Sequence, residues 1–121
     1  MNLEELKYSE EHEWVHLDSN GLAMVGITKF AAENLGDVVF VELPENGSSL
    51  SQFEKMGEIE SVKAVSDLYT PVGGTDFETN DQLVNNPELV NQDPYESGWM
   101  VKITLADIEE LDNLMDSNQY N

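Results

Sequence analysis

The chain has 121 residues, of which 25 are acidic and 5 are basic, and its formal net charge is −20 at pH 7. Nucleic acids and anionic membranes are poor partners for such a chain, because phosphate binding requires basic side chains. The absence of cysteine excludes disulfides, thiolate metal sites and a cysteine nucleophile. With 40% hydrophobic residues, the chain is expected to form one domain, residues 1–121, around a real core.

The first part of the chain predicts strands around one short helix. A strand within Tyr8–Leu17 and a returning strand at Leu22–Ile27 flank the hairpin turn signal Asn20-Gly21. A helix is expected over Thr28–Leu35, with the threonine as its cap and the next glycine as its stop. The apolar, β-branched run Val38–Leu43 then predicts another strand, which a proline ends.

The central part of the chain predicts a hairpin with a lysine at its tip. After a short strand at Ser49–Phe53, the runs Glu58–Val62 and Val65–Thr70 favour pleated structure and fold back at Val62-Lys63-Ala64. That tip carries none of the Asn-Gly residues that tight hairpins prefer. We therefore expect Lys63 to be exposed there for a purpose other than turning. Acidic residues lie on both sides of it in the sequence: Glu58, Glu60 and Asp67.

The last part of the chain mixes strands and helical segments. Thr75–Asn80 is a weaker strand, and Asp81–Val90 suggests one or two helical turns with Pro87 at a first helical position. Trp99–Leu105 predicts a strand, and Asp107–Met115 has the apolar spacing of an amphipathic helix. Many short strands separated by turns indicate a mainly β fold, a sandwich or barrel-like core with short helices and a C-terminal helix.

The segment His12-Glu13-Trp14-Val15-His16 matches the H-E-x-x-H pattern of zinc peptidases. That chemistry requires a helix, in which residues four apart share a face about 6 Å apart along the axis. The tryptophan and valine favour a strand, in which the two imidazoles would lie roughly 13 Å apart. The sequence therefore predicts no metal site here, and no catalytic residue.

Lys63 is not expected to be reactive by itself. A Schiff-base or general-base lysine needs a pKa lowered by burial or by a cationic neighbour, whereas its sequence neighbours are acidic. Ser61 has no base that the sequence places beside it, so a serine nucleophile is weakly supported. If Lys63 has a role, another enzyme must modify it, and an exposed turn is a suitable place for that.

The stretch from Glu60 to Tyr69, with Glu60, Ser61, Val62 and Ala64 around Lys63, resembles the lipoyl-attachment motif of the glycine cleavage system H-protein family. The resemblance covers nearly the whole chain, from about Leu6 to Tyr120. Further segments resemble that family in the right order: His12–Val15, Val25–Thr28, Leu35–Pro44, Pro87–Asn91 and Gly98–Ile103.

The residues beside Lys63 differ from those of two related kinds of carrier domain. Biotin-carrying domains flank their lysine with methionines, and lipoyl domains of 2-oxo acid dehydrogenases usually carry Asp-Lys-Ala within longer chains. This chain departs from the family pattern at four positions, none of them in the lysine motif: Phe30, Gly73, Asp76 and Thr79. Asp76 and Thr79 stand where apolar residues are usual, which puts the packing of that strand in question.

The resemblance implies a lipoyl/biotinyl-domain-like barrel-sandwich hybrid with lipoic acid joined to Lys63. It also implies a non-catalytic carrier of one-carbon metabolism that takes the aminomethyl group of glycine from a pyridoxal phosphate-dependent decarboxylase (P-protein) to an aminomethyltransferase (T-protein). Further implied partners are a dihydrolipoyl dehydrogenase (L-protein) and a lipoylating enzyme. An H-like carrier that relays lipoate, or that serves another redox partner, is the alternative.

The loaded arm of such a carrier ends in a cationic amine. We expect this amine to fold into a cleft near Glu13 and Asp67, because both are acidic and because the resemblance implies that the labile adduct is sheltered. The sequence shows neither a secretory signal nor an apolar run of the ~20 residues that a membrane span needs. We therefore expect a monomer in the bacterial cytoplasm, or in the mitochondrial matrix for a processed eukaryotic form.

Overall fold

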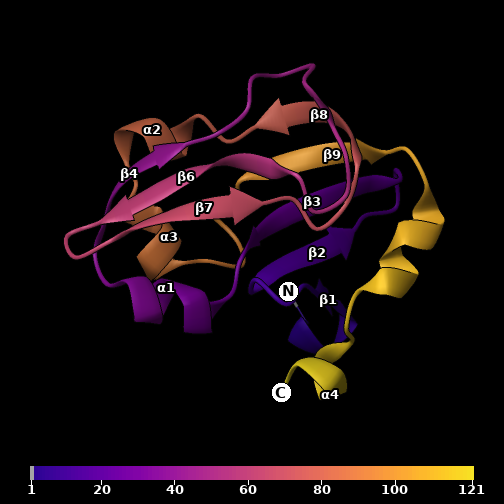
Figure 1. Ribbon diagram of the computed structural model, residues 1–121, viewed down its shortest axis with the longest axis horizontal. Helices are drawn as coiled ribbons and strands as arrows, with labels where there is room; N and C mark the ends of the chain where they lie inside the picture. Colours follow the sequence, from indigo (N-terminus) through magenta and orange to yellow (C-terminus); the bar gives the residue numbers. More distant parts are fainter. Residues whose placement is uncertain (1) are drawn as a thin grey trace.

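The computed structural model describes residues 2–121 and has two antiparallel β-sheets that face each other (Figure 1). The larger sheet has the strand order β1-β2-β3-β9-β8-β5 and the smaller one the order β4-β6-β7. Neither sheet closes on itself, so the core is a sandwich rather than a closed barrel. The strands are β1 (Lys7–Tyr8), β2 (Glu13–Leu17), β3 (Leu22–Ile27), β4 (Val38–Glu42), β5 (Ser49–Leu50), β6 (Lys55–Ser61), β7 (Val65–Tyr69), β8 (Gly74–Thr79) and β9 (Val101–Leu105).

One hydrophobic cluster joins the two sheets. Val25 and Ile103 from the larger sheet belong to the same cluster as Val41 and Ile59 from the smaller one, and all four are almost completely buried. Alternation along each strand directs these apolar side chains inward, which is the pattern of a sheet with one buried face. The predicted mainly β architecture is confirmed.

Short helices cover the ends of the sandwich. They are the 3₁₀-helices η1 (Leu3–Glu5) and η2 (Ile108–Asn113) and the α-helices α1 (Lys29–Leu35), α2 (Gln82–Asn85), α3 (Leu89–Gln92) and α4 (Ser117–Tyr120). The prediction for α1 is confirmed in detail, since the Thr28 hydroxyl accepts from the Ala31 N–H and Gly36, at φ 84°, ends the helix. Between residues 2 and 121, no helix has the length and apolarity to cross a membrane.

The amphipathic helix predicted for Asp107–Met115 is wrong in type and extent. The segment forms the shorter 3₁₀-helix η2, Ile108 is 61% exposed, and the buried Leu114 lies beyond the helix end. Tertiary contacts hold it in this form, because the Glu110 carboxylate accepts from the Gly73 N–H and the Glu110 carbonyl accepts from the Gln52 amide. The spacing of apolar residues within a segment cannot indicate hydrogen bonds to such distant residues.

Two other boundaries differ from the prediction. The strand expected over Ser49–Phe53 is limited to β5, because Phe53 adopts a left-handed backbone with φ 66°. Helix α3 begins at Leu89, two residues after Pro87, so the proline precedes the helix rather than opening it.

The two ends of the described chain meet beside strand β1 (Figure 1). Tyr8 and Met115 exchange backbone hydrogen bonds of 2.8 Å, and the Tyr8 ring stacks on the Tyr120 ring with centroids 4.5 Å apart. The C-terminal helix α4 is thereby fixed next to the turn that leads into strand β2. This turn holds His12, and Glu13 is the first residue of the strand.

Candidate functional site

Lys63 is exposed in the turn between strands β6 and β7, and the turn is held by Ser61. The Ser61 N–H donates to the Ala64 carbonyl at 2.8 Å, while its hydroxyl oxygen accepts from the backbone N–H groups of Lys63 and Ala64 at 3.3 and 3.1 Å. Because this side-chain oxygen accepts hydrogen bonds from two backbone N–H groups of the turn, the turn is stabilised without the Asn-Gly residues that tight hairpins prefer. The motif serine is thus what forms the tip, a role that the sequence analysis did not assign to it.

The tip is also braced from the side. The Val62 N–H donates to the Asp37 carbonyl at 3.0 Å, and the Lys63 stem passes over Gly36, where an added Cβ would lie 3.5 Å from the lysine Cε. The Asn91 amide donates to the Gly36 carbonyl at 2.8 Å and so ties helix α3 to this support. The C-terminal end of helix α1 therefore supports the Lys63 side chain, and the hydrogen bond from Asn91 holds that end in place.

Two of the acidic residues of the hairpin pair with a different lysine. The ammonium of Lys55, on strand β6, lies 2.9 Å from the Glu58 carboxylate and 3.2 Å from the Asp67 carboxylate. Residues 2–121 offer Lys63 no ion pair within 4 Å. From the sequence, these carboxylates were expected near Lys63, and Lys55 was not considered. The sequence alone does not show which of the two lysines the carboxylates face. The Lys63 ammonium is left exposed and available.

Beside the hairpin lies a cavity of about 190 Å³ between strand β7, helix α1 and the start of β2. Both residues predicted for an arm cleft, Glu13 and Asp67, line it. Its other lining residues are Glu11, His12, Ile27, Phe30, Ala31, Asn34, Leu35, Ile59, Ser66 and Leu68. The cavity is thus lined by both apolar side chains and carboxylates. We call it the arm cleft.

Glu13 is the buried acid of the arm cleft, with 2% of its surface exposed. Its carboxylate accepts from the Ser9 hydroxyl at 2.5 Å and from the Tyr69 backbone N–H at 3.5 Å. Burial raises the pKa of Glu13 to about 7, against the smaller lowering effect of these two hydrogen bonds. At neutral pH this carboxyl is therefore poised between its protonated and ionised forms.

His12 stands next to Glu13 with a left-handed backbone, φ 67°. Its Nδ1 lies 2.8 Å from the Tyr120 hydroxyl, and its ring lies 4.9 Å from the ring of Phe30, which is 57% exposed.

His16 lies on strand β2 itself, so the H-E-x-x-H segment is not helical. Nowhere in residues 2–121 do three histidine, aspartate or glutamate side chains gather closely enough to hold a metal ion. Phe30 also lines the arm cleft.

Comparisons with known proteins agree on one family. A family model described as "Glycine cleavage H-protein" matches residues 6–121. A glycine cleavage system H protein of Halothermothrix orenii is 55% identical over 97% of this chain and 91% of its own length, and one of Brevibacillus brevis is 55% identical over 95% and 90%. The crystal structure of a glycine cleavage system H protein from Mycobacterium marinum is similar with a TM-score of 0.87 and 38% identity, over 97% of this chain and 94% of that one.

Proposed function

The chain belongs to the family of glycine cleavage H-proteins, and we propose that Lys63 is the residue to which its lipoyl group is attached. Its function is that of the lipoyl-carrying shuttle of the glycine cleavage system, which takes the aminomethyl group of glycine from the decarboxylase to the aminomethyltransferase. The observation that carries the assignment of Lys63 is its position: exposed at a braced hairpin tip, with no ion pair from residues 2–121.

The residues around Lys63 fit an amide-linked lipoyl group. An acyl group on the amine removes the lysine charge, and since no carboxylate is paired with Lys63, acylation leaves no anion without its partner. When bound, the lipoyl group supplies a disulfide that accepts the aminomethyl group from the decarboxylation of glycine. The contribution of this chain is to hold the attachment point rigid through Ser61, Gly36 and Asn91.

The arm cleft is the place where we expect the cationic end of a loaded arm to rest. A buried carboxylate is stabilised in its ionised form by a nearby cation, so an ammonium beside Glu13 would lower the pKa that burial has raised. Asp67 adds a second carboxylate to the wall, although it also pairs with Lys55. The apolar part of the lining, which includes Ile27, Phe30 and Leu68, would reduce the contact of water with an adduct that hydrolyses.

Further parts of the proposal follow from the carrier role. The P-, T- and L-proteins of the glycine cleavage system are its expected partners, together with the enzyme that attaches the lipoyl group. We propose that the chain itself catalyses none of the steps and acts as a monomer in a bacterial cytoplasm. Residues 1–121 would form one lipoyl-carrier domain, which the hydrophobic cluster spanning both sheets supports.

Mass spectrometry of the natively expressed protein tests the attachment. We expect one lipoyl group per chain, located on Lys63 after proteolysis; an unmodified Lys63, or a lipoyl group on another lysine, would contradict the proposal. A glycine–bicarbonate exchange assay with the decarboxylase then tests the shuttle role. A lipoylated protein that fails in this assay but donates lipoate to other proteins would favour the relay function instead.

A further inference from the structure

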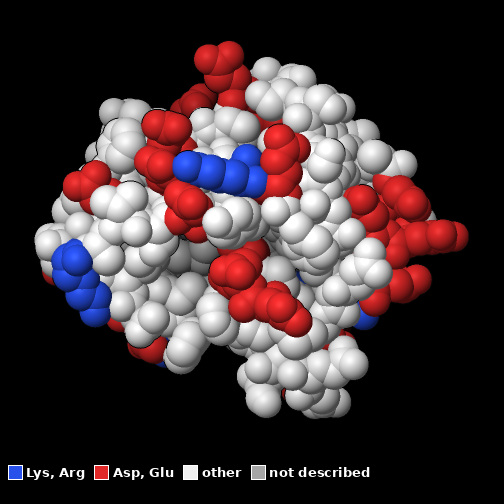
Figure 2. All heavy atoms as spheres, viewed as in Figure 1, with Lys and Arg blue, Asp and Glu red and all other residues white. Residues whose placement is uncertain are grey.

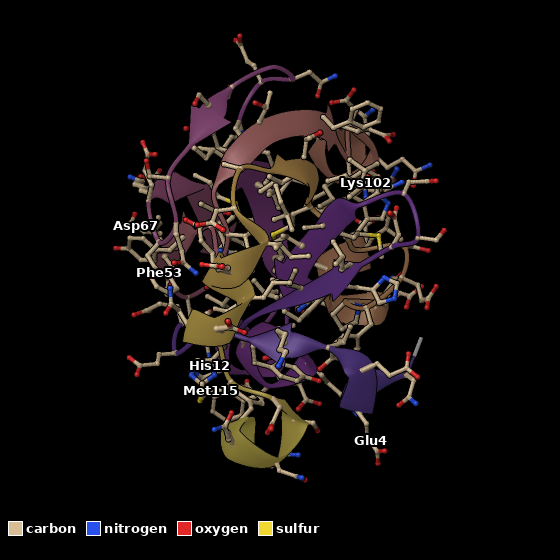
Figure 3. The ribbon with its side chains drawn as sticks, turned by 90° about the vertical axis from the view of Figure 1, so that its right-hand side faces the viewer. Glu4, His12, Phe53, Asp67, Lys102 and Met115 are labelled. Carbon is tan, nitrogen blue, oxygen red and sulfur yellow. The ribbon has the colours of Figure 1, made fainter. Side chains whose placement is uncertain are left out.

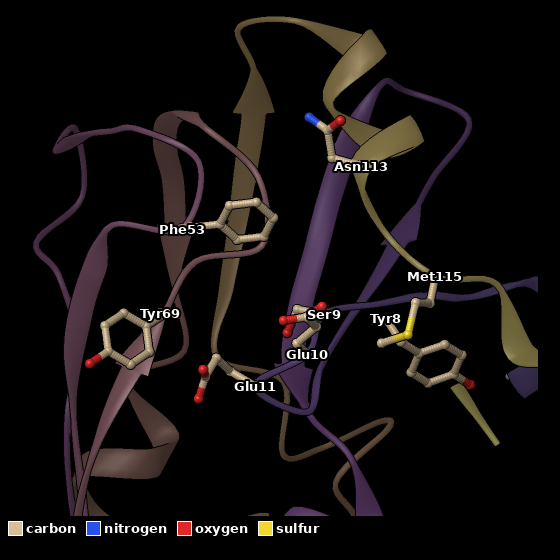
Figure 4. Close-up of a pocket in the computed structure, with 8 residues that line it drawn as sticks. All are labelled: Tyr8, Ser9, Glu10, Glu11, Phe53, Tyr69, Asn113 and Met115. Atoms are coloured by element: carbon tan, nitrogen blue, oxygen red, sulfur yellow. The ribbon is translucent and has the colours of Figure 1, made fainter. Parts of the chain in front are cut away.

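A second and larger cavity, of about 400 Å³, lies on the same side of the molecule as the arm cleft, between the end of strand β7 and the segment that leads into α4 (Figure 4). In the view of Figure 3, Phe53, Asp67, His12 and Met115 all lie toward one side of the molecule, away from Lys102. We call this cavity the aromatic groove. It is lined by Tyr8, Ser9, Glu10, Glu11, Phe53, Tyr69, Asn113 and Met115.

The walls of the aromatic groove have a consistent chemistry. Phe53 and Tyr69 stand on one side and Met115 with Tyr8 on the other, and the exposed carboxylates of Glu10 and Glu11 lie between them (Figure 4). Each described residue that lines it is aromatic, acidic or neutral, and none is basic. Aromatic faces attract cations through their quadrupole, and carboxylates attract them by charge. The ligand that this groove fits is therefore an organic cation with an apolar body.

Phe53 provides an independent sign of function. Its backbone is in the left-handed region, φ 66°, which large side chains rarely adopt, and its ring remains 48% exposed. The conformation is held by its N–H, which donates to the Thr70 carbonyl at 2.7 Å, and by the turn that contains Phe53, which the Glu54 N–H closes by donating to the Ser51 carbonyl. A strained residue held in place by its surroundings, with an aromatic ring directed at a cavity rather than into the core, is typical of a binding site.

We propose that the aromatic groove binds an arginine side chain of a partner protein. Arginine fits better than lysine because its planar guanidinium can stack on an aromatic ring while its fork of N–H groups donates to carboxylates. A net charge of −20 attracts basic protein surfaces, and Figure 2 shows several groups of acidic side chains and few lysines on this face. The inference rests on the proposed function in one respect: it takes the partner from the enzymes that this carrier serves.

The groove adjoins the arm cleft. Glu11 lines both cavities, and the Tyr69 ring lines the groove while its backbone N–H donates to the Glu13 carboxylate in the cleft. The Tyr69 hydroxyl also donates to the Asp67 carboxylate at 3.3 Å. An arginine held in the groove would thus place its partner directly beside the cleft, on the acidic face that also presents Lys63.

A titration followed by NMR tests the site with a defined probe. Nα-acetyl-arginine amide should shift the backbone resonances of Glu10, Glu11 and Phe53 in a saturable way, with a dissociation constant on the order of millimolar, as expected for a fragment of this size. The isosteric neutral probe Nα-acetyl-citrulline amide should not. Equal shifts from both probes, an equal affinity for Nα-acetyl-lysine amide, or unsaturable shifts spread over the acidic surface would each overturn the proposal.

Matched variants test whether the arginine probe binds in the aromatic groove. Glu10→Gln with Glu11→Gln should weaken binding of the arginine probe about tenfold at low salt, whereas Glu45→Gln with Glu88→Gln, which removes two exposed charges elsewhere, should not. Phe53→Leu should weaken it about threefold, and Phe77→Leu, at another exposed phenylalanine, on strand β8, should leave it unchanged. Equal effects from the test and control variants would overturn the assignment.

The same variants are then compared in the lipoylated protein for affinity toward the decarboxylase, the aminomethyltransferase, the dehydrogenase and the lipoylating enzyme. We expect the affinity for at least one of them to fall about tenfold with Glu10→Gln and Glu11→Gln and to be unaffected by the control pair. Unchanged affinity for all four would overturn the docking role. The probe titration does not depend on lipoylation, so its failure is distinct from a failure to find the lipoyl group on Lys63.

Discussion

The carboxylate of Glu13 accepts a hydrogen bond from the backbone N–H of Tyr69 across 3.5 Å, and this bond joins the two sheets. Glu13 begins strand β2 of the six-stranded sheet, and Tyr69 ends strand β7, the strand that follows the lysine turn. A change in the charge of Glu13 therefore alters a hydrogen bond to strand β7, which begins directly after the lysine turn. Two predictions follow from this contact.

The first prediction concerns stability and pH. Burial raises the pKa of Glu13 from 4.5 to about 7, so the native state favours the protonated form. The stabilising effect is complete below about pH 4.5 and is lost as the pH rises through 7. Between pH 5 and pH 8, wild type should lose about 2 kcal/mol relative to Glu13→Gln, measured by chemical denaturation. Glu33→Gln, at an exposed glutamate of helix α1, should show no such trend; a pH-independent difference for Glu13→Gln would contradict the assignment.

The second prediction concerns the loaded arm. If the Glu13 carboxylate pairs with the terminal amine, Glu13→Gln keeps the shape of the cleft but removes the charge, and the aminomethyl group should be lost about tenfold faster from the isolated protein. The measurement follows the decay of the loaded form by mass spectrometry without partner enzymes. Glu33→Gln, on the exposed side of helix α1, is the matched control. A Glu13→Gln decay as slow as that of wild type would remove Glu13 from the cleft role.

The third prediction uses the two lysines of the hairpin. Lys63→Arg should abolish lipoylation completely, because a guanidinium does not form the amide, and should change the free energy of unfolding by less than about 0.5 kcal/mol at this exposed site. Lys55→Arg keeps a cation near Glu58 and Asp67 and should be lipoylated like wild type. Mass spectrometry after incubation with the lipoylating enzyme separates the two. Residual lipoylation of Lys63→Arg would place the attachment elsewhere.

The fourth prediction concerns the turn itself. Ser61→Ala removes the oxygen that accepts from the Lys63 and Ala64 N–H groups, so the tip loses its fixed shape while the strands remain paired. We expect the kcat/KM of the lipoylating enzyme to fall about fivefold to tenfold, which corresponds to about 1 kcal/mol of lost positioning. Ser66→Ala, five residues further along the hairpin on strand β7, should react at the wild-type rate. Equal rates for Ser61→Ala and wild type would mean that the enzyme shapes the turn on binding.

The features predicted correctly from the sequence were those specified by nearby residues. Helix α1 was predicted because its cap and stop, Thr28 and Gly36, are adjacent to it in the chain. The lysine hairpin was predicted because its two strands pair with each other, as register partners such as Glu58 and Asp67 show. In both cases the deciding contacts span only a few residues.

The features that were missed depend on contacts between distant parts of the chain. The 3₁₀ form of η2 depends on Glu110 meeting Gly73, and the position of His12 depends on Tyr120, 108 residues later. The strained backbone of Phe53 follows from its bond to Thr70 rather than from any turn signal in its own segment. The arm-cleft pair Glu13 and Asp67 was chosen for its acidity, and the aromatic groove had no signal in the sequence at all.

The fifth prediction concerns Asp76, which is buried on strand β8. Its side chain is 1% exposed; one carboxylate oxygen accepts from the Thr79 hydroxyl at 2.5 Å, and the other has no hydrogen-bond partner within residues 2–121. The same hydroxyl lies 2.8 Å from the Pro44 carbonyl, and its single proton can serve only one acceptor at a time. A proton on Asp76 would satisfy this arrangement, since the acid could donate to Thr79 and Thr79 to Pro44.

Burial accordingly raises the pKa of Asp76, with the Thr79 hydrogen bond opposing it. Because the native pKa is raised above the unfolded value near 3.8, this site stabilises the protein at low pH and loses that effect as the pH rises. Asp76→Val with Thr79→Val should therefore stabilise the protein by about 1–3 kcal/mol at pH 7, by removing an unsatisfied buried acceptor, and by less at pH 4.5. Thr75→Val, an exposed site on the same strand, controls for the gain in β-propensity. Denaturant unfolding at both pH values is the measurement, and an equal gain at the two would show that the charge of Asp76 plays no part.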